Sequence, residues 1–332
     1  MIIKAGYQEK APAKINLYLN ILDKKFYPRD DGYHNLKTVF QSIDLCDELT
    51  VEFEALVAQS VNFNYEIEFK SNSKETESFG EDNLINRAIK IYLEKMNPKV
   101  LDQIRILKIF INLNKKIPIQ AGLGGGSADA GAMLRVLNQY FTENYNCTMA
   151  SELLEEIALE LGSDVPFCLN SPEKPRRYAE GRGEIFSEPK IVLNPKDISN
   201  LIIIKPDFGI DTAKAYEILN RYAERLRMKK ITGLVFNKDP ALMTIENKET
   251  INELYNNFEE ALFPEYPVLS QIRDTLKSRL FANKVLLSGS GSTMLAFYPE
   301  DTGNLNNLYR KAKEIYEPKN YSVFKCKFLD PC

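Results

Sequence analysis

The chain has 332 residues, of which 44% are hydrophobic and 27% charged, a composition that provides for a folded core and excludes a disordered chain. The 43 lysines and arginines are offset by 46 aspartates and glutamates, which disfavours a dedicated nucleic-acid binder. No apolar run approaches the roughly 18 residues that cross a bilayer, so we expect no membrane segment.

The first residues and the histidine and cysteine content narrow the possibilities further. The N-terminus has neither a long apolar stretch nor an Arg- and Ser-rich amphipathic lead, so we expect a cytoplasmic protein. The single histidine, His34, excludes two-histidine metal sites unless a partner chain supplies a second imidazole. The five cysteines are odd in number and form no C-x-x-C pair, which indicates reduced thiols rather than a disulfide framework or a zinc site.

Alternating apolar and polar residues predict an extended sheet in the first half of the chain. Residues 14–22 alternate strictly, which predicts a half-buried strand whose polar face carries Lys14 and Asn16. Similar alternation and helical spacing predict strands over 49–53 and 107–113 and helices over 84–96, 130–137 and 153–161.

A second pattern begins at about residue 191 and indicates an α+β layer of its own. It predicts strands at 201–205, near 285, at 294–298 and at 321–328, and helices from 211, near 251 and 268, and over 305–315. A chain of this length is expected to form two domains, and the polar stretch 194–200 is the best candidate boundary. We therefore expect domains over 1–190 and 191–332. The tract 228–249 is predicted to be an added lobe, and its residues indicate no function.

Residues 118–130 form the most glycine-rich stretch, between a predicted strand and a predicted helix. Four glycines in five positions leave backbone N–H groups uncovered at the positive end of a helix dipole, which together make a cradle for an anion. The plainer alternative is a flexible turn, but Ser127 at the expected helix start favours the cradle. A Walker A loop needs a lysine after the glycines, and the dinucleotide fingerprint needs glycine in place of Ser127, so both are excluded.

Two further residues are candidates for proton transfer. Lys14 lies on a strand, although a lysine is more often a solvated surface charge. Asp164 follows the helix that ends before Gly162, and a helix N-cap or a turn residue is the alternative. If the two meet, the carboxylate can accept a proton from a substrate hydroxyl while the ammonium orients it and offsets developing charge.

Five segments, in this order, resemble the motifs of the GHMP small-molecule kinases: 11–17, 31–41, 118–130, 162–167 and 288–292. Within that superfamily, P-A-K-I-N-L and D-G-Y-H are similar to the members that phosphorylate 4-diphosphocytidyl-2-C-methyl-D-erythritol on the methylerythritol phosphate route to isoprenoids. The resemblance spans residues 11 to about 298. It implies an α+β, two-domain GHMP kinase fold with a ribosomal S5 domain 2-like N-terminal domain and a ferredoxin-like C-terminal domain.

The resemblance implies a catalytic pair and a nucleotide loop. Lys14 and Asp164 would be catalytic, with Asp164 accepting the proton of the 2-hydroxyl as it attacks the γ-phosphoryl of ATP. Mg²⁺ would help neutralise the triphosphate without a dedicated protein site. The phosphate-binding residues would be Pro118, Ala121, Gly122, Leu123, Gly124, Gly125, Gly126, Ser127 and Ala128.

The resemblance also implies a substrate site. His34 would read the cytosine edge and Tyr33 would stack on the base, with Tyr216 as a second aromatic. Taken alone, His34 could equally be structural and Tyr33 a core residue. The remaining implied contacts are Asn16 near the reacting group, Gly289, Ser290 and Gly291 near the substrate phosphates, and Asn83 and Leu84 beside adenine. Asn83 also suits a plain N-cap, and 288–292 a bare hairpin turn.

Three departures from the family pattern stand out: a longer loop over 23–30, Ser163 in place of a common alanine, and Arg182 inside the Gly-x-Gly-Glu turn. Two competing functions remain open. One is phosphorylation of mevalonate, homoserine or a sugar; the other is an RNA-binding domain of similar topology, which the acidic balance disfavours. The leading expectation is an enzyme with a small cytidyl diphosphate substrate and ATP, without nucleic-acid or membrane partners, as a monomer or weak homodimer.

Overall fold

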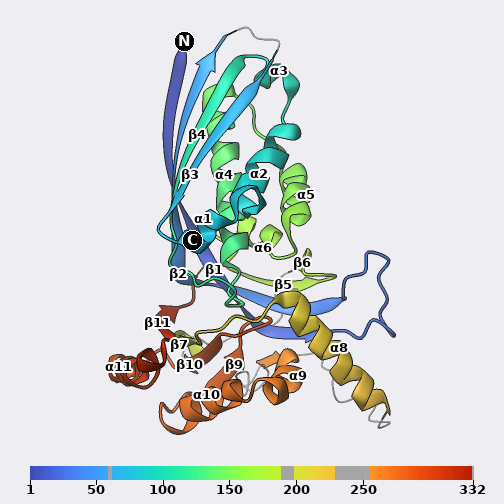
Figure 1. Cartoon of the computed structure of the whole chain (residues 1–332), viewed down its shortest axis with the longest axis vertical. Coiled ribbons are helices and arrows are strands. Elements are labelled where there is room, and N and C mark those ends of the chain that lie inside the picture. The colour runs from blue at the N-terminus through green and yellow to red at the C-terminus, as the bar shows by residue number, and fades with distance from the viewer. Residues whose placement is uncertain (59–61, 188–197, 229–250, 252–253, 331–332) are drawn as a thin grey trace. The chain divides into compact units, whose positions relative to one another are not determined.

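The computed structural model describes residues 1–58, 62–187, 198–228, 251 and 254–330 (Figure 1). The chain forms two compact units that interleave along the sequence. Unit 1 comprises Met1–Ala13, Leu45–Ile117 and Gly124–Glu173, and unit 2 comprises Lys14–Asp44, Pro118–Leu123 and Lys174–Cys332. The division expected at residues 190 and 191, and the tract 229–249, lie outside the described residues, so that division stays a prediction.

Unit 1 is a sheet with helices on one face (Figure 1). Its strands follow the order β3 (Asn64–Ser71), β4 (Ile104–Asn114), β2 (Leu36–Val57) and β1 (Ile2–Ile21), and the last two continue into unit 2. β4 runs parallel to β3 and antiparallel to β2. Its buried residues alternate with exposed ones, because one face of the sheet meets helices and the other meets solvent. The strands predicted over 49–53 and 107–113 are confirmed as parts of β2 and β4.

Three long helices cover this sheet, and each falls where helical spacing predicted one. They are α2 (Leu84–Glu94), α4 (Gly125–Tyr145) and α5 (Ser151–Leu161). Shorter helical turns are α1 (Lys74–Ser78), η1 (Gly80–Asp82), α3 (Pro98–Leu101) and α6 (Val165–Asn170). The start of α4 differs from the expectation, since Gly124 is the N-cap at φ +67° and Ser127 lies within the first turn. A left-handed cap suits glycine, whereas serine avoids that conformation.

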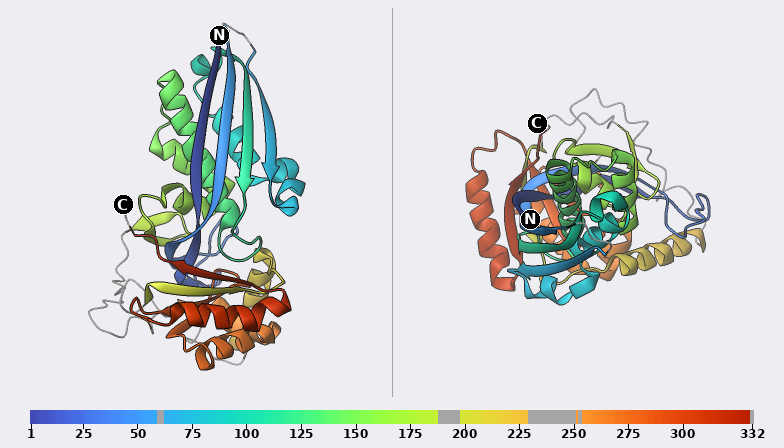
Figure 2. Two further views of the ribbon diagram at one scale, coloured as in Figure 1. Left: turned by 90° about the vertical axis from the view of Figure 1, so that its left-hand side faces the viewer. Right: turned by 90° about the horizontal axis from the view of Figure 1, so that it is seen from above.

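Unit 2 contains a second, four-stranded sheet. Its antiparallel order is β11 (Ser322–Lys327), β7 (Asn200–Lys205), β10 (Met294–Tyr298) and β9 (Lys284–Leu287). Every residue of the central strands β7 and β10 is buried, which agrees with the apolar run in each, and the burial of β7 includes its polar end residues Asn200 and Lys205. Helices α10 (Pro267–Ser278) and α11 (Leu305–Tyr316) lie against this sheet (Figure 2). Further helical segments in the described part of unit 2 include α8 (Thr212–Met228), α9 (Phe258–Glu265) and η4 (Glu317–Lys319).

The continuations of β1 and β2 give unit 2 its remaining strands. β1 pairs in parallel with β8 (Tyr255–Asn256), and β2 pairs with β5 (Arg176–Glu180), which in turn pairs with β6 (Ile185–Ser187). The strand predicted over 14–22 exists, but the expectation of a half-buried strand is wrong, because every residue from 11 to 21 is buried. The helix expected near residue 251 adjoins residues 252 and 253, which are not described. In the described part of the chain, no helix has the length and apolar character needed to cross a bilayer.

Candidate active site

Lys14 and Asn16 lie side by side on the buried part of β1. Lys14 is only 5% exposed, so the alternative of a solvated surface lysine is wrong. Its Nζ donates to Asn16 Oδ1 at 3.1 Å and lies 5.2 Å from the centre of the Phe40 ring. Asn16 Nδ2 in turn donates to the hydroxyl of Thr38 at 2.8 Å. This chain of hydrogen bonds explains how polar side chains tolerate a buried strand and holds the ammonium in one direction.

Two glycine-containing turns of unit 2 meet beside this strand. The backbone N–H of Lys14 donates to the carbonyl of Leu123 at 2.9 Å, which joins β1 to the predicted phosphate loop. Gly122 has φ +72°, and a Cβ there would lie 2.1 Å from the carbonyl oxygen of Ser288. The hydroxyl of Ser288 donates to the carbonyl of Gly122 at 2.9 Å. The loop 118–123 and the turn 288–292 therefore require glycine for close backbone contact.

Gly289 and Gly291 of the second turn also have positive φ angles, +53° and +85°, which favour glycine. Ala121 and Leu123 are buried, Pro118 is partly exposed, and Gly291 donates its N–H to the carbonyl of Ser288 at 2.9 Å. The hydroxyls of Ser290 and Thr212 are 3.2 Å apart. A Cβ on Gly289 would lie 3.6 Å from Asn16 Oδ1, so the turn adjoins the polar face of β1.

The first turn of α4, in unit 1, has backbone N–H groups that precede the first hydrogen bond of the helix. The amide of Ala128 bonds to the carbonyl of Gly124 at 2.8 Å, so the amides of Gly125, Gly126 and Ser127 precede the first intrahelical bond. Gly126 is exposed, and a Cβ there would meet nothing closer than Leu84 Cδ1 at 3.5 Å. Packing therefore does not require glycine at this position, and an open amide at the positive end of a helix dipole suits a phosphate.

Asn83 and Leu84 begin α2 in the same unit. Asn83 Oδ1 accepts the N–H of Ile85 at 2.9 Å, and its Nδ2 donates to the carbonyl of Thr76 at 3.3 Å. The N-cap interpretation of Asn83 is confirmed. Leu84 faces Gly126 of the turn that is predicted to bind phosphate, and its contact with adenine also stays a prediction.

The aromatic residues of the predicted cytidine end lie in unit 2. The His34 ring stacks on Tyr216 with centres 5.0 Å apart and planes at 22°. Burial lowers the pKa of His34, so the ring is neutral at pH 7 and its Nδ1–H donates to the carbonyl of Leu22 at 3.1 Å. Its buried Nε2 has no hydrogen-bond partner among the described residues and is left as an acceptor. Tyr33 is 51% exposed, so the core alternative for it is wrong, and the Arg182 guanidinium lies 4.6 Å from its ring centre.

Asp164 occupies the N-cap position of α6 in unit 1 but makes no capping hydrogen bond there, so the capping alternative is not supported. α6 packs closely on α4, because a Cβ on Gly131 would lie 2.8 Å from the backbone of Cys168. Arg135 of α4 donates to the carbonyls of Cys168 and Leu169 at 2.8 and 3.0 Å. These contacts fix the short helix that carries Asp164. Its convergence with Lys14, which belongs to unit 2, stays a prediction.

Several residues that support the site were not predicted from the sequence. Asn256 Nδ2 donates to the carbonyls of Leu287 and Gly289, both at 2.8 Å, and so fixes the turn 288–292. Thr38 links Asn16 to the carbonyl of Tyr18 at 2.7 Å. A polar residue inside an apolar run was the available hint, but its partner lies far away in the sequence.

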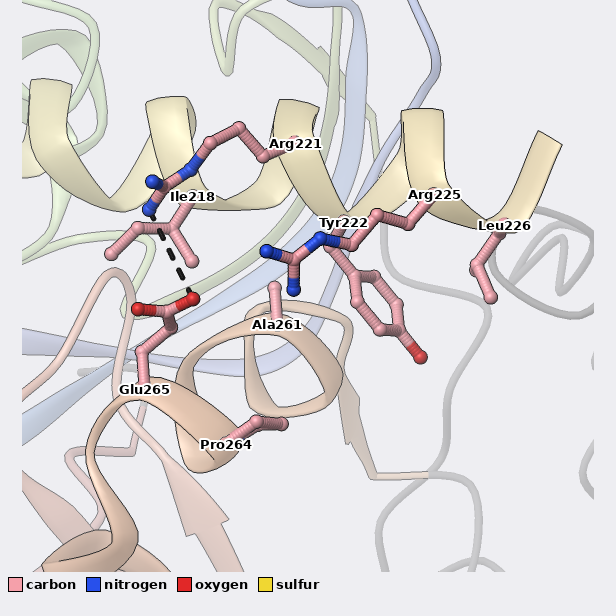
Figure 3. A pocket seen from close by; sticks show the side chains of 8 residues that line it. All are labelled: Ile218, Arg221, Tyr222, Arg225, Leu226, Ala261, Pro264 and Glu265. Carbon is pink, nitrogen blue, oxygen red and sulfur yellow. Dashed lines mark ion pairs between the residues drawn. The ribbon is translucent and has the colours of Figure 1, made fainter. Parts of the chain in front are cut away.

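A separate surface pocket of about 180 Å³ lies between α8 and α9 (Figure 3). It is lined by Ile218, Arg221, Tyr222, Arg225, Leu226, Ala261, Pro264 and Glu265. Arg221 and Glu265 form a partly exposed ion pair at 4.0 Å across it. None of its lining residues is among the predicted site residues, so we do not assign the chemistry to it.

Comparison with known proteins tests the class of enzyme. A family model described as the GHMP kinases N terminal domain matches residues 83–171, which include the first turn of α4 and Asp164. A 4-diphosphocytidyl-2-C-methyl-D-erythritol kinase of Thermoanaerobacter pseudethanolicus is 34% identical over 97% of this chain and 96% of its own length. One of Bacteroides fragilis is 36% identical, with 87% of this chain and 91% of the relative covered.

Solved structures of two kinases also resemble this chain. A 4-(cytidine 5'-diphospho)-2C-methyl-D-erythritol kinase aligns with a TM-score of 0.65 and 25% identity over 97% of this chain and 99% of its own. A mevalonate kinase of L. major aligns with a TM-score of 0.66 at 14% identity, which shows the shared fold alone. The fold and the matched model define a GHMP kinase, which confirms the predicted α+β fold class. Within that superfamily, the chain belongs to the 4-diphosphocytidyl-2-C-methyl-D-erythritol kinase family.

Proposed function

We propose that the chain transfers the γ-phosphoryl group of ATP to the 2-hydroxyl of 4-diphosphocytidyl-2-C-methyl-D-erythritol, a step of isoprenoid precursor synthesis. One observation carries the proposal: Lys14 is buried on β1, directed by Asn16, and joined through its backbone to Leu123 of the glycine loop. A buried ammonium beside a phosphate loop suits phosphoryl transfer, where catalysis is chiefly positioning and charge stabilisation.

The proposed step assigns one role to each group. Asp164 accepts the proton of the substrate's 2-hydroxyl while the hydroxyl oxygen forms a bond to the γ-phosphorus of ATP. The bond from that phosphorus to the β,γ-bridging oxygen breaks, and ADP leaves. Lys14 orients the hydroxyl and offsets charge that develops on the transferring group. The amides of Gly126 and Ser127 bind phosphate oxygens at the start of α4.

Mg²⁺ belongs to the proposal as a companion of ATP. Among the described residues, no group of three or more His, Cys, Asp or Glu side chains could hold a metal ion. Mg²⁺ commonly binds through substrate phosphates and water with few protein carboxylates, so we propose that it arrives with the triphosphate and neutralises part of its charge.

The cytidine end is proposed to lie at His34 and Tyr33. Cytosine carries an exocyclic amino group that donates hydrogen bonds, and the unpartnered Nε2 of His34 is an acceptor. The exposed ring of Tyr33 provides a stacking surface, with Arg182 on it. Mevalonate and homoserine have no base to occupy these groups.

A coupled ADP-release assay against four alcohols tests the proposal. We expect turnover with the cytidyl substrate and little with mevalonate, homoserine or a simple sugar. Preferential transfer to one of the other three would replace the proposed substrate, and salt-dependent RNA binding without ATP turnover would replace the enzyme by a binding protein.

Three further expectations form part of the proposal. They are the domain division at residues 190 and 191, a cytoplasmic location without nucleic-acid partners, and a monomer or weak homodimer. Sedimentation of the purified chain would test the last of these.

A further inference from the structure

A buried cluster of three charged side chains lies beneath the first turn of α4. Lys115 follows the end of β4, Asp47 belongs to β2, and Asp129 belongs to α4. Lys115 Nζ donates to Asp47 Oδ2 and to Asp129 Oδ2, the latter at 2.7 Å. The three side chains are 7%, 0% and 4% exposed. Burying charged side chains costs free energy unless they are closely paired, so we expect this cluster to have a role in the protein.

The same cluster also forms hydrogen bonds to the backbone that follows β4. Asp47 Oδ1 accepts the backbone N–H groups of Lys116 and Ile117, the latter at 2.8 Å. The N–H of Lys115 donates to Asn72 Oδ1 at 2.7 Å. The backbone after β4 is therefore held by side chains just before the glycine loop begins.

The cluster also touches the start of the helix. A Cβ on Gly125 would lie 3.0 Å from Lys115 Nζ and 2.9 Å from Ile117 Cγ2, so the first turn of α4 rests directly on the ammonium. Asp129, one turn further along α4, closes the connection from the helix back to Lys115. One ammonium thus joins the sheet, the entry to the loop and the helix start.

We propose that Lys115, Asp47 and Asp129 form a positioning triad that fixes the first turn of α4, so that the amides of Gly126 and Ser127 point toward the phosphates of ATP. The inference rests on the proposed function, since it assigns ATP to that turn. The proposal assigns these three residues no direct contact with the nucleotide. They act through the backbone, as the supporting contacts of a preorganised binding site do.

The charge balance of the triad agrees with this role. Fully ionised, it would place one surplus negative charge beneath a turn that must attract phosphate. Burial, together with the nearby Asp47 carboxylate, raises the pKa of Asp129 against the opposing effect of Lys115. The raised pKa favours the neutral form of Asp129, which carries no negative charge to oppose an anion at the helix N-terminus.

Three variants of the full-length enzyme test the proposal by steady-state kinetics with each substrate varied in turn. Asp129→Ala removes the acceptor for Lys115 and should raise the KM for ATP about 5- to 30-fold, the effect of losing one charged hydrogen bond. The KM for the alcohol substrate should change less than about twofold. Asp129→Asn keeps an acceptor oxygen and should restore most of the affinity for ATP.

Leu137→Ala is the matched control for loss of stability. Leu137 is fully buried on the same helix, two turns beyond Asp129, so this variant lowers the melting temperature without touching the triad. Its KM for ATP should stay unchanged. The triad proposal is overturned if Asp129→Ala leaves both KM values unchanged or raises them equally, or if Leu137→Ala raises the KM for ATP as much.

The wild-type enzyme separates this proposal from the proposed function. If the wild type transfers phosphate from ATP to a different alcohol, the substrate assignment fails, yet the triad is still tested through the KM for ATP. If the wild type neither turns over nor binds ATP by calorimetry, the nucleotide site fails and the triad proposal fails with it.

Discussion

At the level of single residues, the placement of Lys14 depends on hydrogen bonds that hold a charge inside a strand buried on both faces. We expect Lys14→Ala or Asp164→Asn to lower kcat by about 10²- to 10⁴-fold, the range for losing a positioned proton acceptor or its partner. Lys10→Ala, on the exposed part of β1, is the control and should leave kcat unchanged. Near-normal turnover in either of the first two variants would remove the proposed mechanism.

The neutral His34 ring leads to a second prediction at this scale. His34→Ala should raise the KM for the cytidyl substrate about tenfold, as expected for one hydrogen bond in a desolvated site, with little change for ATP. Phe26→Ala, at an exposed position of the nearby long loop, is the control. An equal rise for both substrates would place His34 outside the cytidine end.

The same ring should respond to pH. Because burial lowers its pKa below the ordinary value of 6.5, His34 stays neutral through pH 7 and gains a proton only in more acidic solution. The protonated Nε2 is a donor and cannot accept from an amino group, so kcat/KM for the cytidyl substrate should fall at acidic pH. His34→Ala should lose this part of the pH dependence.

At the level of elements, the glycines of the phosphate loop separate packing from binding. Gly122 has no room for a Cβ, whereas Gly126 has room and lies in a helix. Gly126→Ala should therefore leave the free energy of unfolding unchanged or raise it by up to about 1 kcal/mol, and the melting temperature should not fall. It should also raise the KM for ATP about tenfold by covering the amide that a charged oxygen would use.

Gly6→Ala provides the control for this contrast. A Cβ at Gly6 would meet nothing within 4 Å, and β1 carries no predicted site residue at that position. It should leave the KM for ATP unchanged. A Gly126→Ala enzyme with normal affinity for ATP would remove phosphate binding from this turn.

The sequence motifs pointed to candidate site residues but not to the residues that support them. Lys14, His34 and the glycine loop stand in short, ordered motifs, so the sequence predicts a site role for each, and the structure joins Lys14 to Leu123 of the loop through a backbone hydrogen bond. Local patterning missed Asp47 and Asp129, because a carboxylate within an otherwise ordinary strand or helix looks like a surface residue until its partner is known. The hydrogen bond from Lys115 to Asp47 spans 68 residues of sequence, a separation over which periodicity carries no information.

At the level of the whole molecule, Glu259 couples stability to pH. Burial raises its pKa from 4.5 to about 7, and its Oε1 accepts the N–H of Leu287 at 2.7 Å. The folded state therefore binds more protons than the unfolded state between these values, so stability falls as pH rises from 4.5 to 7. At pH 8 the raised pKa of Glu259 lowers the free energy of unfolding by at most about 3 kcal/mol.

Glu259→Gln should remove this dependence while keeping an acceptor for Leu287. We expect its melting temperature to exceed that of the wild type by a few degrees at pH 8, with the difference shrinking toward pH 5. Glu265→Gln, at an exposed position of the same helix, should show no such trend. A constant difference at all pH values would mean that Glu259 does not titrate in this range.

The interleaving of the two units has a consequence for any attempt to shorten the protein. A fragment ending at residue 173 holds every stretch of unit 1, but it also holds the segment 14–21 of β1. In the intact chain that segment pairs with β8, and its Leu19 and Ile21 belong to the same buried hydrophobic cluster as the residues of α9, which the fragment lacks. Such a fragment would expose an apolar strand without its pairing partner to solvent, and we expect it to aggregate when it is expressed alone.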